Sequence, residues 1–203
     1  MKDIQSQDTQ IAAILDAAST VFAEHGFAGA RVDAIARAAG LNKAMLYYRV
    51  GDKARLYELV ILSHFDRVSG AVESAVGAAG KGSDPVGALL KVIAGLFRED
   101  PRLPRIMSWE FASGGRTLPD GVAGRWARIL GAVTPLASRA GMDPVLMYLA
   151  LLGPMVLTCL TAPIRSRVVE GMPEPLRRVA EVDVDDMAGF LSQVFRKASG
   201  GAV

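Results

Sequence analysis

The fold is decided by residues 32–53, VDAIARAAGLNKAMLYYRVGDK. Ile35 and the alanines near it share one face of a first short helix, and Gly40 follows as its stop. Asn42 is suited to cap a second short helix, because its side-chain oxygen can accept an otherwise unpaired backbone N–H. Two helices joined by a turn of about four residues that contains glycine form the helix-turn-helix pattern, whose second helix enters the major groove of DNA.

Positive charge is concentrated in the same stretch. Between Arg31 and Arg55 there are six basic residues against two acidic ones, a net charge of +4, while the whole chain carries only +2. Lys43 lies in the first turn of the second helix, where a cation opposes the helix dipole. That placement makes sense if Lys43 faces an external anion, so the cluster favours a nucleic-acid partner. The alternative is a solvated helical pair with ordinary surface lysines.

Residues 9–57 resemble the DNA-binding domain of the tetracycline-repressor (TetR/AcrR) family of bacterial transcriptional regulators. The most specific matching pieces are FAEHGF, IARAAGLN, LYYRVGDK and the LY that follows, in the order and spacing of the family. The resemblance implies an N-terminal three-helix DNA-binding domain and a C-terminal helical domain. In this family the second domain generally dimerises through its last two long helices and carries a pocket whose occupation releases DNA.

The residues expected to bind DNA are Arg31, Asn42, Lys43, Ala44, Met45, Tyr47, Tyr48, Arg49 and Lys53. By the resemblance, Tyr47 and Lys53 correspond to phosphate contacts, and residues 43–45 fall where family members usually meet base edges. Ala30 departs from the family pattern, because many members carry there a threonine that caps the next helix and contacts phosphate. The adjacent Arg31 can supply such a contact instead.

The rest of the first domain follows from periodicity. Residues 9–25 are predicted to form its first helix, because apolar residues recur along one stripe, and residues 1–8 are expected to be a flexible tail. Gly26 ends the first helix, and His25 beside it is interpreted as structural. A longer helix is predicted from Asp52 or Lys53 to the glycine-rich residues 77–84, linking the domain at 9–57 to a second domain at 58–203.

The second domain reads as helical throughout, so the predicted fold class is all-α. No alternating strand pattern appears anywhere in the sequence. Asp84 followed by Pro85 is a helix start, and Pro135 predicts a kink. Beyond the linking helix, predicted helices cover residues 85–97, 102–113, 119–139 and 184–195.

Residues 144–164 contain no charged residue, and this uncharged segment is long enough for a transmembrane helix. Gly153-Pro154 is expected to interrupt this segment and Pro163 to end it. A helix that is apolar all round lies either in lipid or between protein layers, and a homodimer supplies the second layer. The sequence therefore favours a dimer core over membrane insertion. The expected interface residues are Leu152, Val156, Met187, Leu191, Val194 and Phe195.

The candidate effector-binding residues are His64, Phe65, Val68, Met107, Trp109, Glu110, Phe111, Trp126 and Met155. Aromatic residues and methionines at helical spacing equally suit a plain core. Glu110 either pairs with Arg105 or Arg116, which is the favoured reading, or binds a cationic or hydroxylated effector. His64 is a candidate reporter of occupancy, and Cys159 a candidate redox sensor, although a free cysteine in an apolar helix is usually inert.

Composition limits the remaining classes of function. The start MKDIQSQDTQ lacks the apolar region of a secretory signal, and one cysteine and two distant histidines suggest neither a disulfide nor a metal site. No catalytic constellation is found, so neither an enzyme nor a cofactor is expected. The sequence predicts a bacterial cytoplasmic homodimer. It is interpreted as a ligand-responsive repressor released from a palindromic operator in double-stranded DNA by a small, mainly apolar effector. A ligand-independent architectural DNA binder is the alternative.

Overall fold

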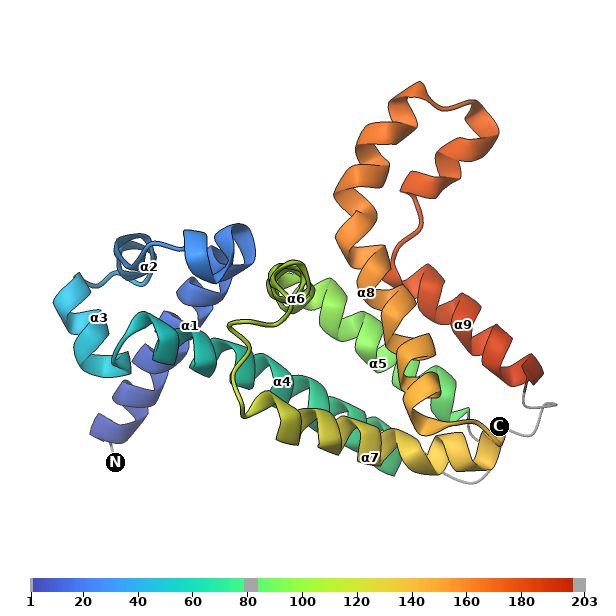
Figure 1. The fold of residues 1–203 in the computed structure, drawn as a ribbon, viewed down its shortest axis with the longest axis horizontal. Helices are drawn as coiled ribbons and strands as arrows, with labels where there is room; N and C mark the ends of the chain where they lie inside the picture. Colours follow the sequence, from blue (N-terminus) through green and yellow to red (C-terminus); the bar gives the residue numbers. More distant parts are fainter. Residues whose placement is uncertain (1, 79–83, 199–203) are drawn as a thin grey trace. The chain divides into compact units, whose positions relative to one another are not determined.

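The computed structural model describes residues 2–78 and 84–198, with the backbone alone for residues 2–8. Within those ranges the chain is helical and contains no strand, which confirms the predicted all-α class. The helices are α1 (Lys2–Gly29), α2 (Val32–Ala38), α3 (Lys43–Val50), α4 (Lys53–Gly77), α5 (Pro85–Glu99), α6 (Arg102–Ser113), α7 (Val122–Ala140), α8 (Pro144–Val168) and α9 (Val184–Ala198), with the 3₁₀ segments η1 (Val169–Gly171) and η2 (Glu174–Ala180) before α9 (Figure 1).

The chain divides into two compact units. The first comprises Met1–Phe65 and Arg105–Val122, and the second comprises Asp66–Pro104 and Ala123–Val203. The sequence placed the boundary after residue 57. The structural division extends the first unit along α4 to Phe65 and adds most of α6 to it. Helices α4 and α6 therefore each begin in one unit and end in the other.

The first helix begins earlier than predicted. It starts at Lys2, within the segment expected to be a tail, because residues 2–8 contain neither proline nor glycine to stop a helix. Its regular part ends at Gly26 as predicted, since Gly26 has φ 64° and ψ 179°, a conformation that is essentially restricted to glycine. A single further helical turn then leads to Gly29.

The second unit is built from pairs of helices. The end of α4 lies along α7 (Figure 1), and Arg125 and Arg128 of α7 form ion pairs with Asp66 and Glu73 of α4, each with a nitrogen–oxygen distance of 2.7 Å. Helix α5 packs against α9 and contacts α8. The apolar stripe predicted for α9 faces this packing, because Val184, Ala188, Leu191 and Phe195 are all buried.

The helix predicted between Pro144 and Pro163 is longer than expected. It is not interrupted at Gly153-Pro154 and continues through Pro163 to Val168. Pro154 cannot donate to the carbonyl of Ala150, but Ala150 is exposed, so water can satisfy that carbonyl. The interruption predicted from the prolines is therefore wrong.

One further boundary differs from the prediction. Helix α7 begins at Val122, because Pro119 instead starts a turn closed by a hydrogen bond from the Val122 N–H to the Pro119 carbonyl, at 3.1 Å. Helix α7 runs through Pro135 to Ala140. The glycine-rich segment after Gly77 falls largely on residues 79–83, which lie outside the described residues.

Candidate nucleic-acid interface

Helices α2 and α3 form the predicted helix–turn–helix. Gly40 ends α2 with φ 68°, a left-handed conformation that side chains rarely adopt. The side chain of Asn42 accepts a hydrogen bond from the backbone N–H of Met45 at 2.8 Å, so Asn42 is the N-cap of α3 as predicted. Leu46 and Val50 are buried on the inner face of α3 and fix its rotation about its own axis.

The outer face of α3 carries the residues expected to read DNA. Successive helical residues are about 100° apart, so Ala44 and Tyr48 lie opposite the buried Leu46, and Met45 lies on the flank beside them. Their exposure agrees, since the exposed fraction is 88% for Tyr48 and 40% for Met45. An exposed aromatic ring beside a small residue offers apolar surface for base edges and thymine methyl groups.

Charged residues flank this face. Lys43 is exposed, and its Nζ lies 3.3 Å from Oδ1 of Asp33 on α2. Tyr47 is 38% exposed on the same flank, and Arg49 is half-buried near the end of α3. Arg31 is exposed at the N-cap position of α2, with no side-chain hydrogen bond to that helix. All nine residues predicted to contact DNA therefore belong to the first unit, and most are exposed.

Lys53 is held in place by the end of α1. Its ammonium lies 4.8 Å from the centre of the Phe27 ring and donates a hydrogen bond to the Ala28 carbonyl at 3.4 Å. Partial burial lowers the pKa of Lys53 below its ordinary value. A lysine on a flexible stem usually samples many positions, so these contacts define where its charge is presented.

The ring of Phe27 belongs to an aromatic cluster with Phe22 and Tyr57. Tyr57 lies 4.8 Å from Phe22 and 5.0 Å from Phe27 between ring centres, and its side chain is buried. Its hydroxyl donates a hydrogen bond of 2.6 Å to the Glu110 carboxylate. Burial and this carboxylate raise the pKa of Tyr57 above its ordinary value, so the phenol remains a donor.

Glu110 is therefore not paired with an arginine, and the prediction that Arg105 or Arg116 neutralises it is wrong. The carboxylate is buried and also accepts hydrogen bonds from the Thr117 hydroxyl and, at 3.3 Å, from the Thr117 N–H. Three donors satisfy a buried carboxylate without a counter-ion. The sequence did not identify Tyr57 and Thr117, because each is a plausible core or loop residue and neither is adjacent to Glu110.

Comparison with known proteins agrees with this geometry. Residues 14–60 match the model of the bacterial regulatory proteins of the tetR family. This stretch of the chain is therefore similar in sequence to the tetR-family regulators. The resemblance seen in the sequence is thereby confirmed, and the match covers α2 and α3 completely together with parts of α1 and α4.

Two curated relatives of this chain are named as a transcriptional repressor and a negative transcriptional regulator. The HTH-type transcriptional repressor SCO4008 of Streptomyces coelicolor is 46% identical over 50 residues, 25% of this chain and 26% of that protein. The biofilm operon negative regulator IcaR of Staphylococcus aureus is 36% identical over 59 residues, 29% of this chain and 32% of that protein. The chain thus matches about a quarter to a third of the length of these relatives. Both are transcription regulators and neither is an enzyme, in agreement with the prediction from the sequence.

Solved structures resemble nearly the whole chain. The fatty acid degradation regulator FadR of Bacillus halodurans superimposes with a TM-score of 0.69 at 16% identity, covering 92% of this chain and 94% of that one. A TetR-family regulator of Marinobacter aquaeolei gives 0.65 at 24% identity, covering 92% and 98%. At these identities the likeness establishes the fold, including a helical C-terminal part.

The residues predicted to bind an effector are divided between the two units. His64, Phe65, Met107, Trp109, Glu110 and Phe111 lie in the first unit, and Val68, Trp126 and Met155 lie in the second. Neither unit by itself assembles the set. Trp109 has a structural role, because its indole N–H donates a hydrogen bond to the Ala23 carbonyl at 3.2 Å. His64 contacts the Ser19 hydroxyl at 3.1 Å. Met155 is fully buried in the core.

The second unit contains a small, partly open apolar cavity of about 30 Å³. Tyr148 supplies the one hydroxyl of its lining. Burial raises the pKa of Tyr148. Val68 is thus the predicted effector residue that lines this cavity directly. The lining residues are Val68, Val72, Leu89, Ile93, Ile129, Val133, Tyr148, Leu151 and Leu152.

The predicted interface residues also separate into two groups. Leu191 and Phe195 are buried within the second unit, and Leu152 lines its cavity, so these three contribute to the unit's own core. Val194 is 42% exposed, and Val156 and Met187 are half-buried. The assignment of the first group to a dimer interface therefore conflicts with their burial.

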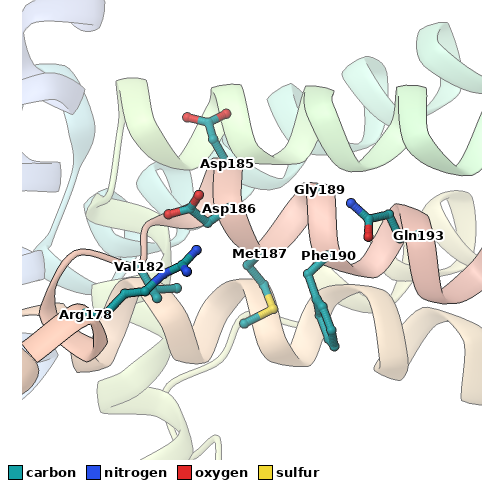
Figure 2. Close-up of a pocket in the computed structure, with 8 residues that line it drawn as sticks. All are labelled: Arg178, Val182, Asp185, Asp186, Met187, Gly189, Phe190 and Gln193. Atoms are coloured by element: carbon teal, nitrogen blue, oxygen red, sulfur yellow. The ribbon is translucent and has the colours of Figure 1, made fainter. Parts of the chain in front are cut away.

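An exposed apolar surface remains on α8 and α9. Met187 lines a hollow of about 470 Å³ along α9, where Met187 and Phe190 point to the same side of the helix (Figure 2). Arg178 and Asp186 lie at one end of this hollow (Figure 2). The exposed large apolar residues of the two helices are Val145, Leu146, Leu149, Leu157, Ile164, Val168, Phe190 and Val194.

Three remaining points from the sequence concern membrane insertion, the single cysteine and metal binding. By length and composition alone, Pro144–Gly171 could cross a membrane, and 22% of its most apolar window is buried. Cys159 is half-buried, and burial raises the pKa of its thiol, which disfavours a reactive thiolate. Among the described residues, no group of three or more histidine, cysteine or acidic side chains is arranged to hold a metal ion.

Proposed function

We propose that this chain is a sequence-specific DNA-binding transcriptional regulator of the TetR family that represses its target. The observation that carries the proposal is the outer face of α3, where Ala44, Met45 and Tyr48 are exposed next to the charge of Lys43. An exposed helix face rich in small and aromatic residues has no structural purpose in a free domain. It suits the major groove, where apolar side chains meet thymine methyl groups and lysine meets guanine.

The flanking residues fit contacts to the DNA backbone. Tyr47 and Lys53 lie beside this face, and Lys53 is a cation of defined position. Contacts of this kind fix the register of a protein on DNA but carry no sequence information, whereas residues 43–45 and Tyr48 would specify bases. Arg31 at the start of α2 is exposed and suited to a further phosphate contact.

The first experiment selects DNA sequences from a random pool and footprints the best binders. A protected palindrome with half-site centres about one helical turn apart, or somewhat more, is expected for a two-fold dimer. Lys43→Ala should then change the preferred bases, while Lys91→Ala, an exposed lysine of α5, is the matched control and should change nothing. Unchanged affinity and base preference in Lys43→Ala would reject the base-reading role. Binding without sequence preference would favour the architectural alternative.

We further propose that a small, mainly apolar effector controls DNA binding through the cavity lined by Val68 and Tyr148. Eight of its nine lining side chains are aliphatic, and one phenol can orient a polar group of the ligand. A cavity of about 30 Å³ has room for only one or two water-sized groups, so the effector has to widen it. Since α4 lines the cavity and also carries Lys53, widening can alter the DNA-binding state.

The effector proposal is tested by titrating a bound ligand with and without operator DNA. Thermodynamic linkage requires that operator DNA lowers the affinity for the ligand by the same factor as the ligand lowers the affinity for operator DNA, typically about 5- to 150-fold. Val68→Phe should fill the cavity and abolish the response, while Val179→Phe, at an exposed position of η2 outside the cavity, should leave it intact. Equal ligand affinities with and without operator would show that the ligand does not control DNA binding.

A homodimer formed through the exposed apolar residues of α8 and α9 completes the proposal. A second copy covers Leu149, Leu157 and Phe190 and brings two α3 helices to one palindrome. This assembly, acting in the bacterial cytoplasm, also explains the apolar length of α8 without a membrane. Partitioning of the purified chain into lipid vesicles would instead favour the membrane alternative.

A further inference from the structure

The end of α6 is built into the DNA-binding unit. Trp109 and Glu110 are adjacent on α6, and each is hydrogen-bonded to a different helix of the first unit. Trp109 reaches the last turn of α1, and Glu110 reaches α4. Both contacts lie within the first unit, although α6 itself begins at Arg102 in the second.

Trp109 supports the turn that places Phe27. Its indole N–H donates to the carbonyl of Ala23, which belongs to the last turn before the break in α1. Its ring lies so close to Gly26 that an added Cβ would be 2.9 Å from Trp109 Cδ2. Phe27 follows Gly26 directly, so the tryptophan ring braces the backbone from which Phe27 projects.

Glu110 supports the Phe27 ring indirectly, through Tyr57. Its carboxylate accepts the hydroxyl proton of Tyr57 in a hydrogen bond of 2.6 Å, and the Tyr57 ring packs on Phe27 with 5.0 Å between ring centres. The Lys53 ammonium lies over the Phe27 ring at 4.8 Å. Lys53 and Tyr57 are also one helical turn apart on α4. A continuous series of contacts therefore runs from Glu110 through Tyr57 and Phe27 to Lys53.

We propose that Trp109 and Glu110 are positioning residues for the phosphate-contacting Lys53. They hold Phe27 and Tyr57, and these rings in turn fix where the ammonium is presented to DNA. The inference rests on the proposed DNA-binding function and adds a regulatory point to it, because any displacement of the end of α6 would release Lys53. It also explains why Glu110 is buried with three hydrogen-bond donors, a costly arrangement for a residue without a function.

The test measures how DNA affinity depends on salt. Each lost phosphate contact lowers the slope of log affinity against log salt by about 1 per subunit. Tyr57→Phe removes the hydroxyl that Glu110 holds and should weaken binding to all sequences by roughly tenfold per subunit, the scale of one charge-assisted hydrogen bond. Its slope should fall as it does in Lys53→Ala. Ser138→Ala removes an exposed hydroxyl of α7 in the second unit, outside the cavity and the candidate interface, and is the control that should keep the wild-type slope.

A second variant guards against loss of stability. Phe27→Leu removes the ring beneath the ammonium but keeps apolar volume at a half-buried position. It should reproduce the lower slope, and combining it with Lys53→Ala should have no further effect on DNA binding, because the two act through one contact. Thermal unfolding of each variant gives the folded fraction at the assay temperature, and affinities are corrected for it. A purely structural role would lower the unfolding temperature and leave the slope of the folded protein unchanged.

The outcomes separate the two proposals. If Lys53→Ala lowers the slope while Tyr57→Phe and Phe27→Leu keep that of the wild type, DNA binding through Lys53 stands and the positioning role is rejected. If Lys53→Ala itself leaves affinity and slope unchanged, Lys53 does not contact phosphate and the positioning role is rejected with it. If the wild type does not bind DNA, the proposed function fails.

Discussion

At the scale of single residues, the geometry of the candidate nucleic-acid interface depends on a few residues that other residue types cannot replace. Gly26 combines a backbone conformation that other residues avoid with a tryptophan ring against its α-carbon. Glu110 is a buried acid satisfied entirely by neutral donors. Each of these residues brings together segments that are distant in the sequence, so each should be sensitive to small changes.

Gly26→Ala is expected to destabilise the protein by about 1–3 kcal/mol, from backbone strain at φ 64° and from the contact with Trp109. Gly131→Ala in α7 is the matched control. It has ordinary helical geometry and no neighbouring atom within 4 Å, so it should stabilise the protein by about 0.5–1 kcal/mol. Urea unfolding measures both. Equal stabilities of Gly26→Ala and the wild type would show that the turn after α1 can relax without cost.

At the scale of helices, caps and periodicity were sufficient for most boundaries. Asn42 caps α3 and Asp84 caps α5 as predicted, since a cap is a local interaction between residues three positions apart. The continuation of α8 through Pro154 was not predictable, because it depends on whether the unpaired carbonyl is exposed. The nine predicted DNA contacts lie in the unit where the sequence put them, because one short motif contains nearly all of them.

The side-chain contacts that the sequence missed join distant segments. Tyr57 and Glu110 are 53 residues apart, and no local pattern indicates that a phenol and a carboxylate will meet. The apolar stripe of α9 was recognised, yet its periodicity could not show that Leu191 faces α5 rather than a second subunit. The effector candidates were chosen by residue type alone, and the structure divides them between two units.

The start of α5 gives a prediction that depends on pH. Burial alone would raise the pKa of Asp84, but hydrogen bonds from Gly87 N, Arg196 and Ser192 outweigh it, so the pKa lies below the ordinary 3.8. A lowered folded-state pKa means that the stabilisation is present above pH 3.8 and is lost as the pH falls through the folded value. Asp84→Asn keeps a capping side chain but loses the charge.

Asp84→Asn should therefore be less stable than the wild type at neutral pH by about 0.5–1 kcal/mol, because Arg196 is largely exposed and its ion pair is screened by solvent. The two proteins should converge in stability as the pH falls below about 4, near the ordinary aspartate pKa. Urea unfolding at a series of pH values measures the difference. Asp143→Asn provides the comparison. Asp143 is also an N-cap followed by a proline, and its side chain accepts hydrogen bonds from two backbone N–H groups but, among the described residues, from no arginine. A stability difference for Asp84→Asn that does not change with pH would contradict this account.

At the scale of the whole molecule, the decisive question is what covers α8 and α9. A single chain exposes several large apolar side chains on these helices, among them Leu149, Leu157 and Phe190. Folded monomers rarely expose continuous apolar surface beyond a few hundred Å². The proposed two-fold dimer would bury this surface, and the proposed binding of a palindromic operator by two α3 helices would require the same symmetry.

Adjacent residues of α9 separate assembly from folding. Phe190 is 60% exposed and Leu191 only 7%. Phe190→Glu places a charge on the surface that a second copy would cover, so this variant should remain helical, become monomeric and lose most of its affinity for a palindromic operator. Leu191→Glu buries an unpaired charge against α5 and should instead unfold the second unit, since an unpaired buried charge costs several kcal/mol. Light scattering measures the mass, and circular dichroism during heating measures the cooperativity of unfolding. A well-folded wild-type monomer at micromolar concentration would eliminate the dimer, and a dimeric Phe190→Glu protein would move the interface away from this face of α9.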